Sequence, residues 1–141
     1  MKKSVAFTVY GNPKPWTRAG TMSKVKRKDG TIKHLNSPIH FDRNDPTWTQ
    51  AVRMAGEEHR LPELLTGPLS MSIRFYLQRP KSKPKRIEYP DVKPDLDNLG
   101  KLIKDLLEGL IYKNDSQICE MKIYKQYAEE APQANIWIGQ M

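Results

Sequence analysis

The sequence holds a single cysteine and no long apolar run. Cys119 is alone among the 141 residues, so no disulfide can form within the chain, and a reducing, cytoplasmic setting is expected. A membrane-spanning helix needs a run of about 18 apolar residues, and the sequence has none. The apolar stretch after Met1 ends early, at Gly11-Asn12-Pro13, so it is too short for a signal peptide. A membrane partner is therefore not expected.

Acidic residues are scarce as well, and they are unevenly placed. The chain has 24 Lys and Arg residues against 16 Asp and Glu residues, a net charge of +8. Residues 1–36 hold nine basic residues against one acid, and residues 79–93 hold six against two, whereas residues 94–141 hold five against eight. Basic segments beside an acidic cluster indicate a polyanionic partner, such as nucleic acid, next to a cation site. A protein whose exposed loops are merely basic is the alternative, and charge alone leaves both interpretations open.

The length of the chain fits one domain, and its patterns predict an α+β fold. Residues 69–77 alternate between apolar and polar side chains, which is the period of a strand with one buried face. Further strands are predicted at residues 4–10, 117–127 and 134–138, the last two as a hairpin across Ala131-Pro132. We expect a single small two-layer domain over residues 1–141, with a mixed β-sheet packed against two main helices.

The two helices have recognisable ends. Asp45-Pro46 is typical of a helix start, and a helix is predicted at about residues 46–60. Its inner face would carry Trp48, Val52 and Ala55. Leucines recur at helical spacing from Leu96 to Leu110 and predict a second helix at about residues 97–109. Asp97 is expected to cap that helix, and Gly109 to end it.

Two segments lack the pattern of a core element. Residues 14–40 predict an exposed, flexible basic ribbon, because two weakly apolar arms meet at the turn sequence Lys28-Asp29-Gly30. Residues 79–94 contain four prolines and predict an extended basic loop. Within the first segment, Trp16 either stacks on a nucleic-acid base or packs under a loop.

Acidic residues at the start of the second helix suggest a metal site. Asp95 and Asp97 are separated by one leucine, which can anchor the turn so that their carboxylates converge. Mg²⁺ prefers oxygen ligands, commonly one or two carboxylates with phosphate and water. Asp115, between helix and strand, is either a third carboxylate or part of a plain turn. Lys101 lies one helical turn after Asp97, and with Asp105 it fits an ordinary ion-paired helix face equally well.

An ordered set of positions between residues 93 and 118 resembles a known family. The set comprises Lys93-Pro94-Asp95-Leu96-Asp97-Asn98-Leu99, Lys101, Asp105-Leu106-Leu107, Gly109 and Asp115-Ser116-Gln117-Ile118. It resembles the RusA family of Holliday junction resolvases, which are small Mg²⁺-dependent endodeoxyribonucleases often encoded by phages or prophages. The rest of the chain agrees with the family more loosely.

The resemblance implies a role for each matching residue. Asp95, Asp97 and Asp115 match the family's metal-binding catalytic aspartates, and Lys101 matches its catalytic lysine. The implied cofactor is Mg²⁺, with Mn²⁺ as a substitute. The implied activity is resolution of Holliday junctions by paired symmetric nicks, in DNA recombination and repair, with a four-way DNA junction and a second copy of the chain as partners. Asn114 departs from the family, since many members carry an acid at this position.

Basic residues of the ribbon and the loop are the candidates for binding DNA phosphates. They are Lys14, Arg18, Lys24, Lys26, Arg27, Lys28, Lys33, Lys81, Lys83, Lys85 and Arg86. Two rival functions stay open: a non-catalytic nucleic-acid-binding module, and another Mg²⁺ phosphotransfer enzyme that acts on nucleotides. Tyr76, Tyr124 and Trp137 are expected in the core rather than at a dimer interface, and Cys119 is expected to be buried.

Overall fold

Four strands form one mixed sheet. This computed structural model describes the backbone of residues 1–141 and all side chains except those of residues 21–22 and 38–41. The strands of the sheet are β1 (Ser4–Tyr10), β4 (Leu69–Leu77), β5 (Ile118–Tyr127) and β6 (Gln133–Gln140), in the order β1-β6-β4-β5. β6 is antiparallel to both β1 and β4, whereas β4 and β5 are parallel. The predicted mixed sheet in an α+β domain is therefore confirmed.

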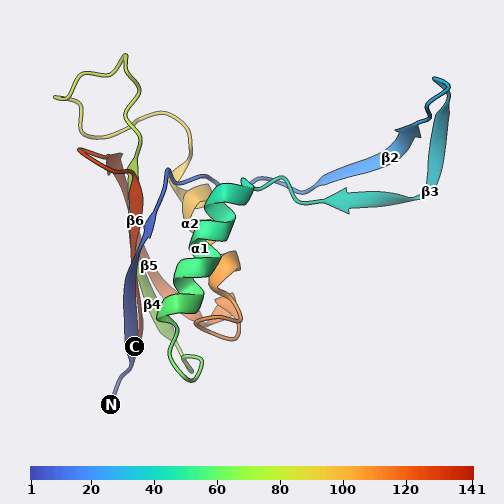
Figure 1. The fold of residues 1–141 in the computed structure, drawn as a ribbon. Helices are drawn as coiled ribbons and strands as arrows, with labels where there is room; N and C mark the ends of the chain where they lie inside the picture. The colour runs from blue at the N-terminus through green and yellow to red at the C-terminus, as the bar shows by residue number, and fades with distance from the viewer.

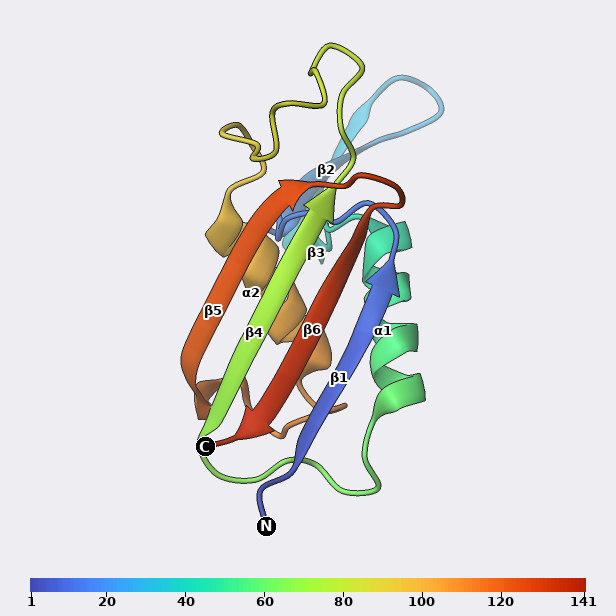
Figure 2. The ribbon, with the colours of Figure 1, turned by 90° about the vertical axis from the view of Figure 1, so that its left-hand side faces the viewer.

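The alternation of β4 determines which face of the sheet is covered. Its five apolar residues, from Leu69 to Leu77, are at most 5% exposed, while the residues between them are partly exposed. Both helices lie on the apolar side, so the molecule has two layers (Figure 2). The core consequently sits between one face of the sheet and two helices.

The first helix, α1 (Pro46–His59), packs behind β1. Oδ1 of Asp45 accepts a hydrogen bond from the backbone N of Trp48 at 3.0 Å, and Pro46 opens the helix, as the sequence predicts. Trp48 and Val52 are fully buried. A Cβ at Gly56 would come within 2.8 Å of Leu107, so the glycine allows α1 to approach the second helix closely.

The second helix, α2 (Leu96–Leu107), packs behind β5. Here the close approach occurs at Gly100, where a Cβ would lie 2.8 Å from Cε of Met121 on β5. The helix begins and ends within two residues of the predicted bounds. After it, Gly109 adopts a φ of +85° and its N donates to the carbonyl of Tyr112 at 2.7 Å, which turns the chain away from the helix.

The predicted hairpin of the last two strands is wrong. β4 lies between β5 and β6 and pairs with both. The physical reason is the connection through α2, because a helix between two strands allows them to lie parallel and adjacent. Two strands close in sequence are therefore separated by a strand that precedes both.

The basic ribbon consists of β2 (Gly20–Lys26) and β3 (Ile32–Phe41), which pair antiparallel and project away from the sheet (Figure 1). The predicted turn is confirmed: Oδ1 of Asp29 accepts from both the N and the Oγ1 of Thr31, at 2.9 and 2.6 Å. These bonds hold the pKa of Asp29 below its usual value. Residues 21–22 and 38–41 of the predicted ribbon lie outside the described side chains.

The outer face of the sheet has no helix over it and carries aromatic side chains. Trp137 and Tyr124 are 39% and 44% exposed, and Tyr76 is partly exposed. Their expected place in the core is wrong, because they occupy the strand positions that face away from both helices. Cys119 is exposed too, contrary to expectation, and it lies where the register of β4 and β5 is irregular. No helix among the described residues is long and apolar enough to cross a membrane.

Candidate metal centre and nucleic-acid interface

Asp95 occupies the N-cap of α2 but does not cap it. Its backbone is extended, with φ −70° and ψ 142°, yet its side chain makes no capping hydrogen bond. An N-cap aspartate ordinarily accepts a bond from the first turn of its helix. The carboxylate of Asp95 is exposed and leaves its oxygens available to a ligand. The expectation that Asp97 is the cap is wrong by two positions, since Asp97 lies inside the first turn.

Asp97 is exposed beside Asp95 at the same end of α2. Its Oδ1 accepts a hydrogen bond from the backbone N of Asn98 at 3.0 Å. The exposed N–H groups of a helix start favour negative charge, so two carboxylates are tolerated there. The pair would still repel unless a cation lay between them. This end of α2 therefore combines hard oxygen donors with a need for positive charge.

Lys125 holds the segment that leads into Asp95. From the end of β5, its Nζ donates to the carbonyl oxygens of Val92 and Pro94, at 2.8 and 3.0 Å. No motif in the sequence singles out this residue. A signal existed, because Lys125 continues the alternation of Met121 and Ile123, which place apolar side chains on the face that packs against α2. A lysine at such a position needs polar partners.

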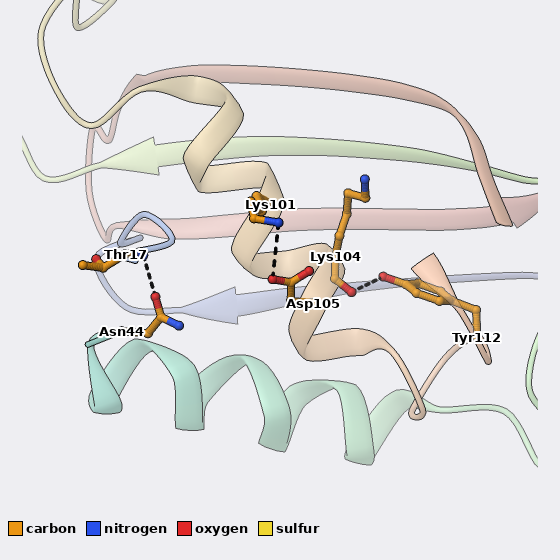
Figure 3. A network of polar contacts seen from close by, with 6 residues as sticks. All are labelled: Thr17, Asn44, Lys101, Lys104, Asp105 and Tyr112. Atoms are coloured by element: carbon orange, nitrogen blue, oxygen red, sulfur yellow. Dashed lines mark hydrogen bonds and ion pairs between the residues drawn. The ribbon is translucent and has the colours of Figure 1, made fainter. Parts of the chain in front are cut away.

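Lys101 lies one turn below Asp97 on the polar side of α2. Its Nζ is 3.9 Å from Oδ2 of Asp105, and the two side chains face each other (Figure 3). The same Nζ lies 5.0 Å from the centroid of the Trp16 ring, a cation–π geometry. Lys101 is thereby held between the root of the ribbon and the middle of α2.

Asp115 lies beside the C-terminal half of α2, in the 3-10 helix η1 (Asp115–Gln117). Its backbone N donates to Oε1 of Glu108 at 3.2 Å, and its charge reaches Asp105. Asp105 follows Asp97 by eight residues, or roughly 12 Å of helical rise. Among the described side chains, no three Asp, Glu, His or Cys residues are grouped so that they could hold one metal ion. The structure thus places Asp115 apart from Asp95 and Asp97.

Asn114 has a local role. Its side chain accepts from the backbone N of Ser116 at 3.0 Å, while Oε1 of Gln117 accepts from the backbone N of Asn114 at 2.9 Å. This reciprocal arrangement caps η1. The polar set Asn114 to Gln117 therefore fixes the backbone on which Asp115 is displayed.

The pKa of Asp105 is raised by partial burial, although Lys101 opposes the shift and Asp115 and Glu108 add to it. A raised pKa means that the folded state favours the protonated carboxyl, so its stabilising contribution is present at low pH and is lost as the pH rises through the folded pKa. We expect Asp105→Asn to be more stable than the wild type near neutral pH. The gain should be less than about 1 kcal/mol, because water screens this partly exposed group.

Thermal unfolding near neutral pH and at about pH 3 checks this expectation, since aspartates with an ordinary pKa near 4 are protonated at the lower value. The difference in melting temperature between wild type and variant should disappear at low pH. Asp91→Asn, which removes an exposed acid from the loop before α2, is the matched control. A variant less stable than the wild type at neutral pH would mean that the ion pair with Lys101 outweighs the cost of burial.

The ribbon is fastened to the start of α2. The backbone N of Trp16 donates to the carbonyl of Asn98 at 2.8 Å. The backbone N of Thr17 donates to Oδ1 of Asn44 at 2.6 Å, which joins the two sides of the ribbon root (Figure 3). The direction in which β2 and β3 leave the molecule is therefore tied to the helix that carries Asp95 and Asp97.

Basic side chains flank this end of α2 on two sides. The ribbon and the loop 79–94 both extend from the same end of the sheet, opposite the chain termini (Figures 1 and 2). Most of the predicted phosphate-binding residues are exposed; Lys14 and Lys83 are partly buried. The exposed set is Arg18, Lys24, Lys26, Arg27, Lys28, Lys33, Lys81, Lys85 and Arg86. Two cationic arms with a carboxylate pair between them suit a polyanion that spans both arms.

Two comparisons with known proteins bear on this arrangement. Residues 17–139 match the family profile described as "Endodeoxyribonuclease RusA". A protein of Bacillus subtilis (strain 168) named "Uncharacterized protein YqaN" is 34% identical, over 97% of this chain and 96% of that protein. The matched range includes β2, β3, the loop 79–94 and every candidate metal-binding residue.

Proposed function

The chain belongs to the RusA family of endodeoxyribonucleases, whose members are Holliday junction resolvases, and we propose that it cuts four-way DNA junctions by paired symmetric nicks that depend on Mg²⁺. The observation that carries the proposal is the uncapped carboxylate of Asp95 beside Asp97, between two basic arms. Its place would be DNA recombination and repair, where such junctions arise.

The residues present fit a hard divalent cation. Asp95 and Asp97 supply carboxylate oxygens at an exposed position, and a phosphate and water can complete the coordination that Mg²⁺ prefers, with Mn²⁺ as a substitute. A bound cation would polarise the scissile phosphate and lower the pKa of an attacking water. Lys125 would keep the segment before Asp95 in place while DNA binds, through its bonds to Val92 and Pro94.

Lys101 is proposed to stabilise negative charge on the phosphate or on the leaving oxygen. Its support is position, one turn from Asp97 and exposed toward solvent. Asp115 is proposed as the third metal-binding aspartate, as the family resemblance implies. It lies within electrostatic reach of Asp105, the partner of Lys101.

The experiment that tests the proposed function compares a synthetic four-way junction with a linear duplex of matched sequence, each with and without Mg²⁺. We expect two symmetric nicks, in the junction alone and only when Mg²⁺ is present. Tight junction binding without any cut would favour a non-catalytic binding module. Hydrolysis of free nucleotides with no cut in the junction would favour a nucleotide-specific phosphotransfer enzyme.

Lys125→Met tests the support of the metal centre. The variant keeps the aliphatic part of the side chain but loses both bonds to the loop carbonyls. Loss of such supporting contacts typically lowers metal affinity or activity by about 10–100-fold. We therefore expect cutting to need more Mg²⁺, as measured by titrating the cutting rate with the ion. Lys122→Met, on the exposed side of the same strand, is the control and should titrate as the wild type does.

A homodimer is proposed because a four-way junction is cut in two opposed strands, and two-fold symmetric proteins match such a substrate. The exposed aromatic face of the sheet is its proposed interface. We expect Trp137→Glu to shift the protein toward monomer in sedimentation experiments, since a buried charge without a partner opposes association. Met54→Glu, on the exposed side of α1, should leave the assembly unchanged. A Trp137→Glu protein that sediments as the wild type would exclude this face.

A further inference from the structure

A cavity of about 460 Å³ opens beside Asp95. It lies between the root of the ribbon, the end of β4 and the loop that precedes α2. Its size falls within the range of about 300–1,000 Å³ that is typical of sites for small molecules. Asp95 and Asn98 both line it, so the cavity is continuous with the proposed metal centre.

The walls of the cavity suit a flat, apolar ring. They include Trp16 and Tyr127, together with prolines from three separate segments of the chain. Trp16 is packed partly against the core. Tyr127 is only 4% exposed and has the Arg79 guanidinium over its ring, at 4.9 Å from the centroid, so it forms the wall of the cavity and is not a stacking face. Aromatic side chains that are already ordered stack on nucleobases at little further entropic cost. The cavity is preformed rather than dependent on closure.

The side-chain carboxamides of Asn98 and Gln78, which line the cavity, have hydrogen-bonding groups without partners among the described residues. Among the described residues, the side chains of Asn98 and Gln78 make no hydrogen bond, although both line the cavity. A carboxamide offers two donors and an acceptor, and can pair with the edge of a base. At the rim, Lys14 and Lys93 carry positive charge toward the backbone phosphates of an entering strand.

We propose that this cavity binds one unstacked nucleobase of the DNA strand next to the scissile phosphate. The inference rests on the proposed function, and it adds a specificity element to that function. When the arms of a four-way junction are unstacked from one another, each base at its centre has one stacking neighbour fewer than in a duplex, so it can leave its stack at a lower cost. Trp16 would stack on the base, and Asn98 and Gln78 would read its edge. The cavity would thus set which sequence is cut.

The test uses four-way junctions in which one base near the crossover is replaced by 2-aminopurine, a fluorescent base that brightens when unstacked. Binding is measured with Ca²⁺ in place of Mg²⁺. We expect the wild type to change the fluorescence at one position adjoining the cut, and at no position of a linear duplex. Val92→Trp fills the cavity from its exposed rim and should abolish that change. Tyr89→Trp, in the same loop but outside the cavity, should preserve it.

A second measurement uses cutting with Mg²⁺. An abasic site at the responsive position should slow the wild type about tenfold, the scale of one base–aromatic stack, and should not slow Val92→Trp further. If that variant does not fold or bind the junction, Gln78→Trp on the opposite wall replaces it. Absence of any fluorescence change, or a change that survives both variants, would overturn the inference. A junction that is left uncut by the wild type would refute the proposed function, while the fluorescence still tests the cavity.

Discussion

Asp95→Asn is expected to abolish Mg²⁺-dependent cutting of a four-way junction and to leave binding of the junction nearly unchanged. The Asn side chain has the same size but one weak oxygen ligand in place of a carboxylate. Metal-assisted stabilisation of the phosphate is worth several kcal/mol, so the cutting rate should fall by about a thousandfold or more. Because Asp95 forms no capping bond and Asp95→Asn removes its repulsion with Asp97, the melting temperature of the metal-free protein should not fall. Single-turnover cutting measures the rate, a binding titration measures the affinity for the junction, and thermal unfolding measures the melting temperature.

The same substitution at Asp97 should have the same effect, and at Asp115 it tests the third member of the proposed set. The three aspartates would act together if each Asn variant binds the junction but does not cut it. Asp91→Asn, four residues before Asp95, is the matched control and should cut normally. Normal cutting by Asp115→Asn would leave a two-aspartate centre at the start of α2. Normal cutting by Asp95→Asn would remove the metal centre from that position.

Neutralising the ribbon should produce the largest loss of affinity. Five basic residues of the ribbon, Lys24, Lys26, Arg27, Lys28 and Lys33, would be replaced by Gln. If each contacts one phosphate, the negative slope of log affinity against log salt concentration should become shallower by about 4 to 5 units. Affinity near physiological salt should fall by about a thousandfold. Binding titrations at several salt concentrations measure both quantities. The rate of cutting at saturating protein should fall far less, because the ribbon lies away from the carboxylates.

Replacing two other sets of basic residues shows whether the loss of affinity is specific to the ribbon or follows from any loss of positive charge. Lys2 and Lys3 lie at the opposite end of the sheet from the ribbon, so their replacement by Gln should leave the salt dependence nearly unchanged. Replacing Lys81, Lys83, Lys85 and Arg86 should lower the slope by about 3 to 4 units if the second arm also holds DNA. A ribbon variant with an unchanged slope would contradict the proposed role of the ribbon in binding.

Elements that carry their own periodicity could be predicted from the sequence, and contacts between distant segments could not. The alternation of β4 and the leucine spacing of α2 depend on local burial, so their bounds were found to within two residues. Which strands are neighbours depends on the path of the chain through α2, and the hairpin prediction failed there. The prediction that Trp137 is buried failed for a related reason. The pattern of a strand does not show which of its two faces the helices cover.

The candidate site also has parts that could be predicted from local sequence and parts that could not. Asp95 and Asp97 are two residues apart, so their proximity follows from the chain itself. The position of Asp115 depends on the turn after α2, where Gly109 and the buried Tyr112 redirect the backbone. Lys125 and Trp16 reach the site from β5 and from the ribbon root, across contacts that no local pattern records.

The connection between β4 and β5 has a consequence for engineering. It carries, in order, the basic loop 79–94, Asp95 and α2, while the strands on either side pair along their whole length. Changing the length of a surface loop costs little, because the closure entropy grows only with the logarithm of its length. A loop from another protein could therefore be grafted between residues 81 and 86, leaving intact the register of the sheet, the bond from Tyr127 to the carbonyl of Glu88 and the segment held by Lys125. The phosphate contacts of this second arm would then be an exchangeable module on a constant scaffold.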